Sequence, residues 1–334
     1  MSMLIRTVLG DKRPEELGAI LPHEHTIYSL QGAEVDHKSA YDREAALQLA
    51  ADELRAVKDL YGISGLLDAA PFDLGRDIEF DVEISKRSGV HIIASTGIFG
   101  VWGFPYYWQM RDIDAMEEFF HREITEGVVG TGVKCGVIKV GSGPGLIEME
   151  PGTSEDGGGR IPISKDRAFR AAARVQRSLG VAITTHTDPS DWDSINIGSK
   201  QLDILEEEGA DPSRCIIGHA TGTANLDYLV DLLKRGCAIG FDTIGLNWGF
   251  SLDVVAGVVV GLVALGYEKQ LLLSHDRWST EVTRPPIEKD IFKFEGVDLG
   301  FLHREFIPKL MKMGISQDVV RQITVANPQR LLAF

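Results

Sequence analysis

The sequence predicts a (β/α)8 barrel, the TIM-barrel fold, formed as a single domain over residues 1–334. Short apolar segments alternate with amphipathic segments of helical period about eight times along the chain, as this fold requires. The apolar segments are nearly continuous, which is typical of parallel strands buried on both faces. Groups that can bind metal stand at the ends of several of them, so we expect the active site at the carboxyl-terminal rim of the strands. A doubly wound open sheet is the alternative, but it gives no reason for polar groups at so many strand ends.

The elements follow from this alternation. Apolar runs predict strands at residues 18–25, 63–70, 90–97, 135–140, 181–186, 215–219, 237–242 and 270–276. Helical periodicity predicts helices at residues 42–61, 77–88, 112–127, 166–179, 199–208, 226–234 and 252–265, with two more near 303–313 and 317–324. Asp42 is the expected N-cap of the first helix, and Gly62 is expected to end it.

Composition narrows the class of protein. The 334 residues are 44% hydrophobic and 25% charged, which suits a large core and excludes bulk disorder. The net charge of −15 argues against nucleic acid or an anionic membrane as a partner. No signal-peptide pattern, membrane-spanning run or Cys-x-x-Cys spacing is present, so we expect a cytoplasmic protein whose three cysteines are reduced and buried.

Two histidines one residue apart, His23 and His25, end the first predicted strand. Residues i and i+2 of a strand point to the same face, so both imidazoles project in one direction, as a shared metal ion requires. The alternative, without a metal ion, is a pair of hydrogen-bonded polar residues at a strand end.

Four other predicted strands end in groups that can complete such a site. Lys139 lies in Gly-Val-Ile-Lys-Val-Gly, His186 in Thr-Thr-His-Thr, His219 in Ile-Ile-Gly-His, and Asp276 in Ser-His-Asp. Because all strands of a barrel end at the same rim, these groups would converge although they are far apart in the sequence.

Lys139 stands among apolar neighbours, where an unpaired ammonium would be costly to bury. Burial lowers the pKa of a lysine and favours the neutral amine, which can add carbon dioxide and become a carbamate. A carbamate is an anionic oxygen ligand able to bridge two cations. The alternative is a lysine that forms a salt bridge with a carboxylate such as Asp276; the four histidines favour the carbamate.

In combination, these motifs resemble the phosphotriesterase family of the amidohydrolase superfamily. The likeness runs almost end to end, from Leu-Pro-His-Glu-His at 21–25 to Ala-Asn-Pro at 326–328. The resemblance implies a homodimer in which each barrel holds two divalent metal ions, with zinc expected and manganese, cobalt or iron as alternatives. It assigns the more buried ion to His23, His25 and Asp276 and the more exposed ion to His186 and His219, with a carboxylated Lys139 and a hydroxide between them.

The expected chemistry is hydrolysis without a protein nucleophile, and no Gly-x-Ser-x-Gly motif is present to supply one. Two cations produce hydroxide at neutral pH, the hydroxide attacks a carbonyl or phosphoryl centre, and Asp276 accepts its proton. The catalytic residues would therefore be Asp276 and the bridging Lys139.

Two positions depart from the family members that act on phosphotriesters or acyl-homoserine lactones. These usually carry an acidic residue three places after the Gly-His histidine and a His or Arg after the aspartate of the seventh strand. Here Gly222 and Thr243 stand at those places, as in the phosphotriesterase-homology branch. We therefore expect a small-molecule ester substrate, either a lactone or a carboxylic ester, with at most weak phosphotriesterase activity. The alternatives are an amidase of a small N-acyl compound and a non-catalytic binding protein that contains metal.

Aromatic residues near the predicted rim are candidates for the substrate pocket. Tyr28 follows His25, Trp278 follows Asp276, and Trp102 follows the third strand. They would line an apolar pocket. Loop packing and a dimer interface are the alternatives.

Overall fold

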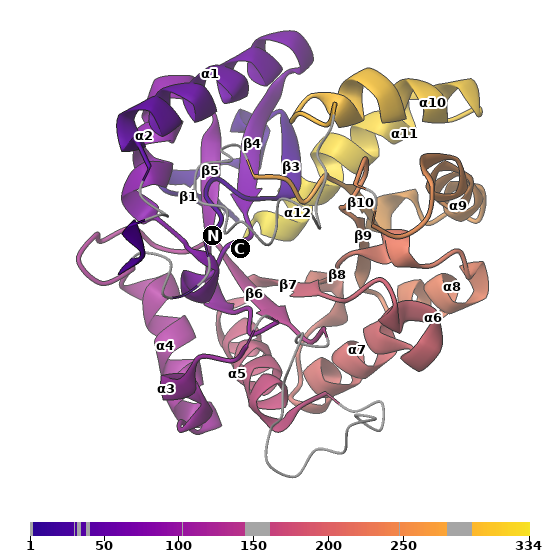
Figure 1. The fold of residues 1–334 in the computed structure, drawn as a ribbon. Helices are drawn as coiled ribbons and strands as arrows, with labels where there is room; N and C mark the ends of the chain where they lie inside the picture. Colours follow the sequence, from indigo (N-terminus) through magenta and orange to yellow (C-terminus); the bar gives the residue numbers. More distant parts are fainter. Residues whose placement is uncertain are drawn as a thin grey trace.

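The computed structural model describes residues 3–29, 31, 35–37, 41–101, 103–143, 161–246, 248–278 and 296–334. In these residues, eight parallel strands form one sheet in the order β10-β9-β8-β7-β6-β5-β4-β3. Figure 1 shows helices arranged as an outer ring around the strands. The predicted (β/α)8 barrel is therefore confirmed.

The elements alternate along the chain as this fold demands. The barrel strands are β3 (Ala19–Glu24), β4 (Ile63–Asp68), β5 (His91–Ile98), β6 (Val137–Gly141), β7 (Ala182–His186), β8 (Cys215–Ile217), β9 (Ala238–Phe241) and β10 (Leu271–Leu273). The helices between and after them are α1 (Arg43–Tyr61), α2 (Ile78–Ser88), α3 (Tyr106–Gln109), α4 (Ile113–Thr125), α5 (Ile163–Leu179), α6 (Asp191–Ile195), α7 (Ile197–Glu207), α8 (Leu226–Lys234), α9 (Leu252–Ala264), α10 (Ile307–Lys312), α11 (Gln317–Arg321) and α12 (Asn327–Leu332). Short turns of 3-10 helix join several of them.

The strand predictions agree with the structure to within a few residues, but both ends of the chain differ. The hairpin of β1 (Ile5–Thr7) and β2 (Gly10–Lys12) was not predicted, because three-residue strands are too short to show a period. The last predicted helices are interrupted by π-helical turns at Leu302–Phe306 and Gln322–Ala326, and α12 was not predicted. The termini meet, because backbone hydrogen bonds join Leu4 and Phe334.

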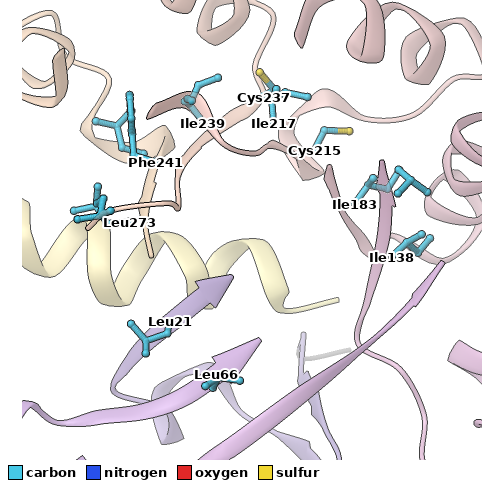
Figure 2. Packing of buried hydrophobic residues seen from close by; sticks show 14 of the residues in the cluster. Leu21, Leu66, Ile138, Ile183, Cys215, Ile217, Cys237, Ile239, Phe241 and Leu273 are labelled. Carbon is cyan, nitrogen blue, oxygen red and sulfur yellow. The ribbon is translucent and has the colours of Figure 1, made fainter. Parts of the chain in front are cut away.

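The core has two layers. Outward-facing strand residues such as Leu66, Ile138 and Ile183, labelled in Figure 2, belong to one large buried cluster with helix residues such as Leu54 and Phe169. The three cysteines are buried and unpaired; Cys215 and Cys237 lie in this outer layer. Inside the barrel, a floor of apolar side chains lies below the rim and consists of Ile5, Leu17, Ile20, Leu67, Ile93, Val137, Ala182, Leu332 and Ala333.

An irregularity in β3 turns the two histidines toward the barrel interior. Ile20 belongs to the inner floor, whereas Leu21 packs in the outer layer. The register between β3 and β4 then shifts between Leu21 and Glu24, so that His23 and His25 follow on the inner side and Glu24 on the outer side. A bulge of this kind changes the direction in which side chains point, and here it turns His23 and His25 toward the inside of the barrel at its rim.

Strands β3 and β10 are the two ends of the sheet order and close the barrel at its rim. The amide of Asp276 donates to the carbonyl of His23 (3.2 Å), and the amide of His25 donates to the carbonyl of Arg277 (2.8 Å). The closing contacts therefore involve the predicted metal ligands and their neighbours. No helix among the described residues is long and apolar enough to cross a membrane.

Candidate metal centre

The structure brings all six predicted ligands to the same end of the barrel. They stand at or just after the ends of five strands: His23, His25, Lys139, His186, His219 and Asp276. All but Asp276 are buried, and the Asp276 side chain is 15% exposed. That they bind metal stays a prediction, which their geometry supports.

The first group links β3 to the segment after β10. Nε2 of His25 lies 3.0 Å from Oδ1 of Asp276, and Nε2 of His23 lies 3.5 Å from the same oxygen. These three atoms can all face one ion. Burial lowers the pKa of His23 to about 4, helped by the charge of Lys139, so its ring is neutral and offers a lone pair.

The amine of Lys139 lies against this group, with Nζ 2.9 Å from Nε2 of His23. Its hydrogen-bond partner is thus a histidine. Burial lowers the pKa of Lys139 to about 8, although the charges of Asp276 and Asp242 oppose the shift. A measurable share of the amine is therefore neutral near pH 7, as carbamate formation requires.

The second group contains His186 and His219. Nδ1 of His186 lies 2.6 Å from Nε2 of His219, which is itself 3.9 Å from Oδ2 of Asp276. Burial and the neighbouring charge of His219 hold the pKa of His186 well below its usual range. The rings of His186 and His219 thus turn nitrogens toward one point beside Asp276.

Asp242, just after β9, is a functional candidate that the sequence analysis missed. Its Oδ1 accepts from the backbone amide (2.7 Å) and Nδ1 (2.8 Å) of His219. Its Oδ2 lies 2.8 Å from Nδ1 of His23, off the line of a hydrogen bond. Burial alone would raise the pKa of Asp242, but the His219 and His23 rings hold it well below its usual range.

This carboxylate touches the outer nitrogen of one histidine in each group, which leaves the two Nε2 atoms turned toward the other predicted ligands. The signal was available in the sequence, because the seventh apolar run also ends in an acidic residue. A set of His23, His219 and Asp242 can also be drawn as a metal site. Asp242 lies against the Nδ1 atoms of both histidines, which is the position of a group that supports the ligands from outside.

The donor set fits two divalent ions. Four imidazoles, one carboxylate and one buried amine provide the nitrogen and oxygen ligands that zinc and related metals accept. His219 and Asp276 also have left-handed backbones, with φ of 61° and 56°. Strained residues of this type persist where their surroundings hold them, and they cluster at functional sites.

Comparison with known proteins agrees with this geometry. The model of the phosphotriesterase family matches residues 3–332. The chain belongs to the phosphotriesterase family. Similar proteins include an aryldialkylphosphatase of Saccharolobus solfataricus, 28% identical over 96% of both chains. The phosphotriesterase homology protein of Escherichia coli is 27% identical over 94% of this chain and 97% of its own.

Solved structures resemble the chain more closely. A mutant organophosphorus hydrolase of Deinococcus radiodurans superimposes with a TM-score of 0.84 at 32% identity, covering 99% of this chain and 97% of that one. A structure described as engineered for organophosphate hydrolysis from a weak promiscuous lactonase template gives a TM-score of 0.84 at 33% identity, covering 99% and 100%. Enzymes of the phosphotriesterase family use a binuclear metal centre, and these relatives support a hydrolase.

The two departures from the family pattern have structural reasons. A side chain at Gly222 would collide with Pro189, because a Cβ there would lie 2.6 Å from Cα of Pro189. The hydroxyl of Thr243 forms a hydrogen bond with that of Thr221. Neither Gly222 nor Thr243 offers an acidic or basic side chain.

Aromatic residues surround the candidate centre of this phosphotriesterase-family chain. Tyr28 and Trp278 stack with ring centroids 4.9 Å apart, and Tyr28 lies edge-on to His25 at 6.2 Å. On the other side, Phe99 lies 4.9 Å from the ring of His186 and Trp248 lies 5.2 Å from that of His219. The predicted pocket residue Trp102 lies outside the described residues.

Proposed function

We propose that this chain is a metal-dependent hydrolase of small esters, foremost lactones or carboxylic esters, with at most weak activity on phosphotriesters. One observation carries the proposal. Four imidazoles, a buried amine and a carboxylate from five strands gather beside one another, with neighbouring donor atoms 2.6 to 3.9 Å apart. A barrel that needed only stability would have no reason to collect so many buried nitrogen and oxygen donors side by side at its rim.

His23, His25 and Asp276 would hold one divalent ion, His186 and His219 a second, and a carboxylated Lys139 would join both. Such ions, when bound, lower the pKa of a water molecule and polarise the substrate oxygen. Zinc is the expected metal, and manganese, cobalt and iron suit the same ligands.

The chain's own groups prepare this site. The neutral amine of Lys139 attacks carbon dioxide, an N–C bond forms, and one proton leaves to solvent, which gives an anionic carbamate. Asp276 is the most exposed of the six residues, so its carboxylate can accept a proton from water and pass it to a departing alkoxide. Asp242 holds the orientation of His219.

The surroundings support a small apolar ester. Phe99, Trp248 and the Tyr28–Trp278 pair place aromatic surface around the donors. Gly222 and Thr243 leave out the charged groups that orient homoserine lactones or relay protons from phosphotriesters in the family. A plain lactone or aryl ester therefore suits the site better than either.

The test is a substrate panel of γ-lactones, aryl carboxylic esters, N-acyl amides and a phosphotriester, run with metal-loaded and chelated protein. We expect ester turnover that chelation abolishes and zinc or manganese restores. Asp276→Asn should remove it, whereas Asp231→Asn, the same change on the exposed face of α8, should not. Equal turnover with and without metal would exclude the proposal, amide turnover alone would favour the amidase, and metal binding without any turnover would favour a binding protein.

The homodimer also remains a proposal. Three large apolar side chains at α3, Tyr106, Tyr107 and Met110, are more than half exposed, which supports a protein partner there. Sedimentation equilibrium distinguishes one 36.6 kDa chain from two.

A further inference from the structure

Glu24 stands between His23 and His25 in the sequence, but its side chain points away from theirs. It is completely buried and lies outside the set of predicted ligands. Its Oε1 accepts from Oγ of Ser274 (2.7 Å) and from the amide (2.9 Å) and Nδ1 (2.8 Å) of His275. Its Oε2 accepts from the amide of Arg277 (2.9 Å). One carboxylate thus receives four hydrogen bonds from both sides of Asp276.

The orientation of His275 is fixed from its other side. Nε2 of His275 accepts from the amide of Leu302 (2.9 Å), so its proton must be on Nδ1, where it is donated to Glu24. Leu302 begins the π-helical turn Leu302–Phe306. A chain of hydrogen bonds therefore runs from the last helical region through His275 to Glu24.

Three further bonds join the same two segments. The amide of His23 donates to Oγ of Ser274 (3.2 Å), and the backbones of His23 and His25 bond to those of Asp276 and Arg277. Asp276 itself has a positive φ of 56°, which a non-glycine residue keeps only when its neighbours hold it there. Glu24 binds the residue before Asp276 and the residue after it, so it is the group best placed to impose that backbone.

We propose that Glu24 is a positioning residue that fixes the carboxylate of Asp276 against His23 and His25. It does so by holding residues 274–277 across the barrel seam, the contact between β3 and the segment that follows β10. This inference rests on the proposed metal centre. It assigns to Glu24 a role in metal affinity at one of the two sites, beyond that of a buried acid that merely closes the barrel.

The first test is Glu24→Gln. The amide keeps the size of the side chain but offers one acceptor oxygen instead of two, so some of the four donors lose their partner. The measurement is zinc affinity by competition with a chromogenic chelator, together with zinc per chain after dialysis. We expect affinity at one site to fall about 10–100-fold and the other site to keep its zinc.

Glu123→Gln is the matched control. Glu123 is also a buried carboxylate with several bonds, to Arg76 and Thr96, but it lies on α4 away from the ligands. The Glu123→Gln variant should have a lower melting temperature than wild type and unchanged zinc binding. Ser274→Ala, which removes one donor to Glu24, should weaken the same zinc site less and serves if Glu24→Gln does not fold.

A double-mutant cycle decides whether Glu24 acts through Asp276. Glu24→Gln combined with Asp276→Asn should bind zinc no more weakly than Asp276→Asn alone. Wild-type zinc affinity in Glu24→Gln, additive losses in the cycle, or equal losses at both sites would overturn the role of Glu24. Failure of the wild-type chain to bind zinc would instead remove the proposed function itself, and the role of Glu24 with it.

Discussion

Asp242 acts on both groups of predicted ligands, whereas Glu24 reaches only one. Its two oxygens lie 2.8 Å from Nδ1 of His219 and Nδ1 of His23. An outer carboxylate of this kind fixes the ring orientation and raises the basicity of the metal-binding nitrogen. Because one carboxylate supports two rings, the two metal sites should depend on each other through it.

Asp242→Asn should therefore weaken zinc binding at both sites by about 10–100-fold, because an amide is uncharged and places only one acceptor oxygen beside the two Nδ1 atoms. Chelator competition measures both constants. Asp231→Asn on the surface is the control for the substitution itself. Loss at one site only would mean that Asp242 supports His219 alone.

Asp73 gives a pH-dependent prediction away from the metal ligands. Its carboxylate accepts from the amides of Phe99 (3.0 Å) and Gly100 (2.8 Å), and so holds the loop that carries Phe99 to His186. Burial raises the pKa of Asp73 to about 6, although these two amides oppose the shift. The folded state therefore binds the proton more tightly than the unfolded chain, whose aspartates titrate near about 3.9.

Proton linkage gives the direction in which the Asp73 carboxyl changes stability with pH. The stabilising contribution of the raised pKa is complete below pH ~4 and is lost as the pH rises through ~6. Relative to Asp73→Asn, the wild-type free energy of unfolding should fall by roughly 1–3 kcal/mol between pH 4.5 and 7.5. Urea unfolding of both metal-free proteins at the two pH values measures the difference. A constant difference across that range would contradict the prediction.

At the scale of single residues, the sequence could predict the six candidate ligands because parallel strands share one rim. The same rule could have marked Asp242 as a candidate, but the supporting roles of Asp242 and Glu24 come from side-chain contacts across about 23 and 250 positions of sequence. Nothing in the sequence indicated the register shift in β3. Alternation alone would place Leu21 on the same face as His23, yet Leu21 packs in the outer layer.

Among the elements, α1 shows which local signals were sufficient. Asp42 accepts from the amide of Ala45 (3.0 Å), and Gly62 ends the helix with φ of 70°, so both predicted caps are confirmed. Such signals need only neighbouring residues. The π-helical turns near 302 and 322 depend on packing across the molecule, and no local sequence pattern predicts them.

Loss of the Asp42 N-cap hydrogen bond should measurably reduce the free energy of unfolding. Asp42→Ala should reduce the free energy of unfolding by about 1 kcal/mol, because the first turn of α1 loses an acceptor, whereas Asp42→Asn should stay close to wild type. Urea unfolding at pH 7 checks both. Equal losses in the two variants would show that charge, and not the cap bond, matters at Asp42.

Helix α1 also contributes to the rim. Glu53 on α1 accepts from Nη1 of Arg277 (2.5 Å) and from the amide of Leu299 (3.3 Å). Arg277 follows Asp276, so the helix holds the same segment that Glu24 holds through Ser274, His275 and Arg277. Stability of the element and geometry of the site are thus connected through one ion pair.

Over the whole molecule, the proposed ions would join segments that the sheet alone leaves separate. β3 and β10 meet chiefly at the rim, through His23, His25 and the residues around Asp276. Ligands on β6, β7 and after β8 would tie the opposite wall to this seam. An unfolded chain has no such arrangement of donors, so metal should bind the folded state almost exclusively.

Binding to the folded state alone stabilises by RT ln(1 + [L]/Kd), which is about 4 kcal/mol at a thousandfold excess over Kd. Removing the metal with a chelator should therefore lower the melting temperature by several degrees, on the order of 2–4 °C per kcal/mol for a large domain. Adding zinc back should restore it in wild type, but only in part in His23→Asn, which removes a ligand from the seam. Scanning fluorimetry with and without chelator measures the shift, and Asp231→Asn should follow wild type. An unchanged melting temperature after complete removal of metal would mean that the ions do not join the walls of the barrel.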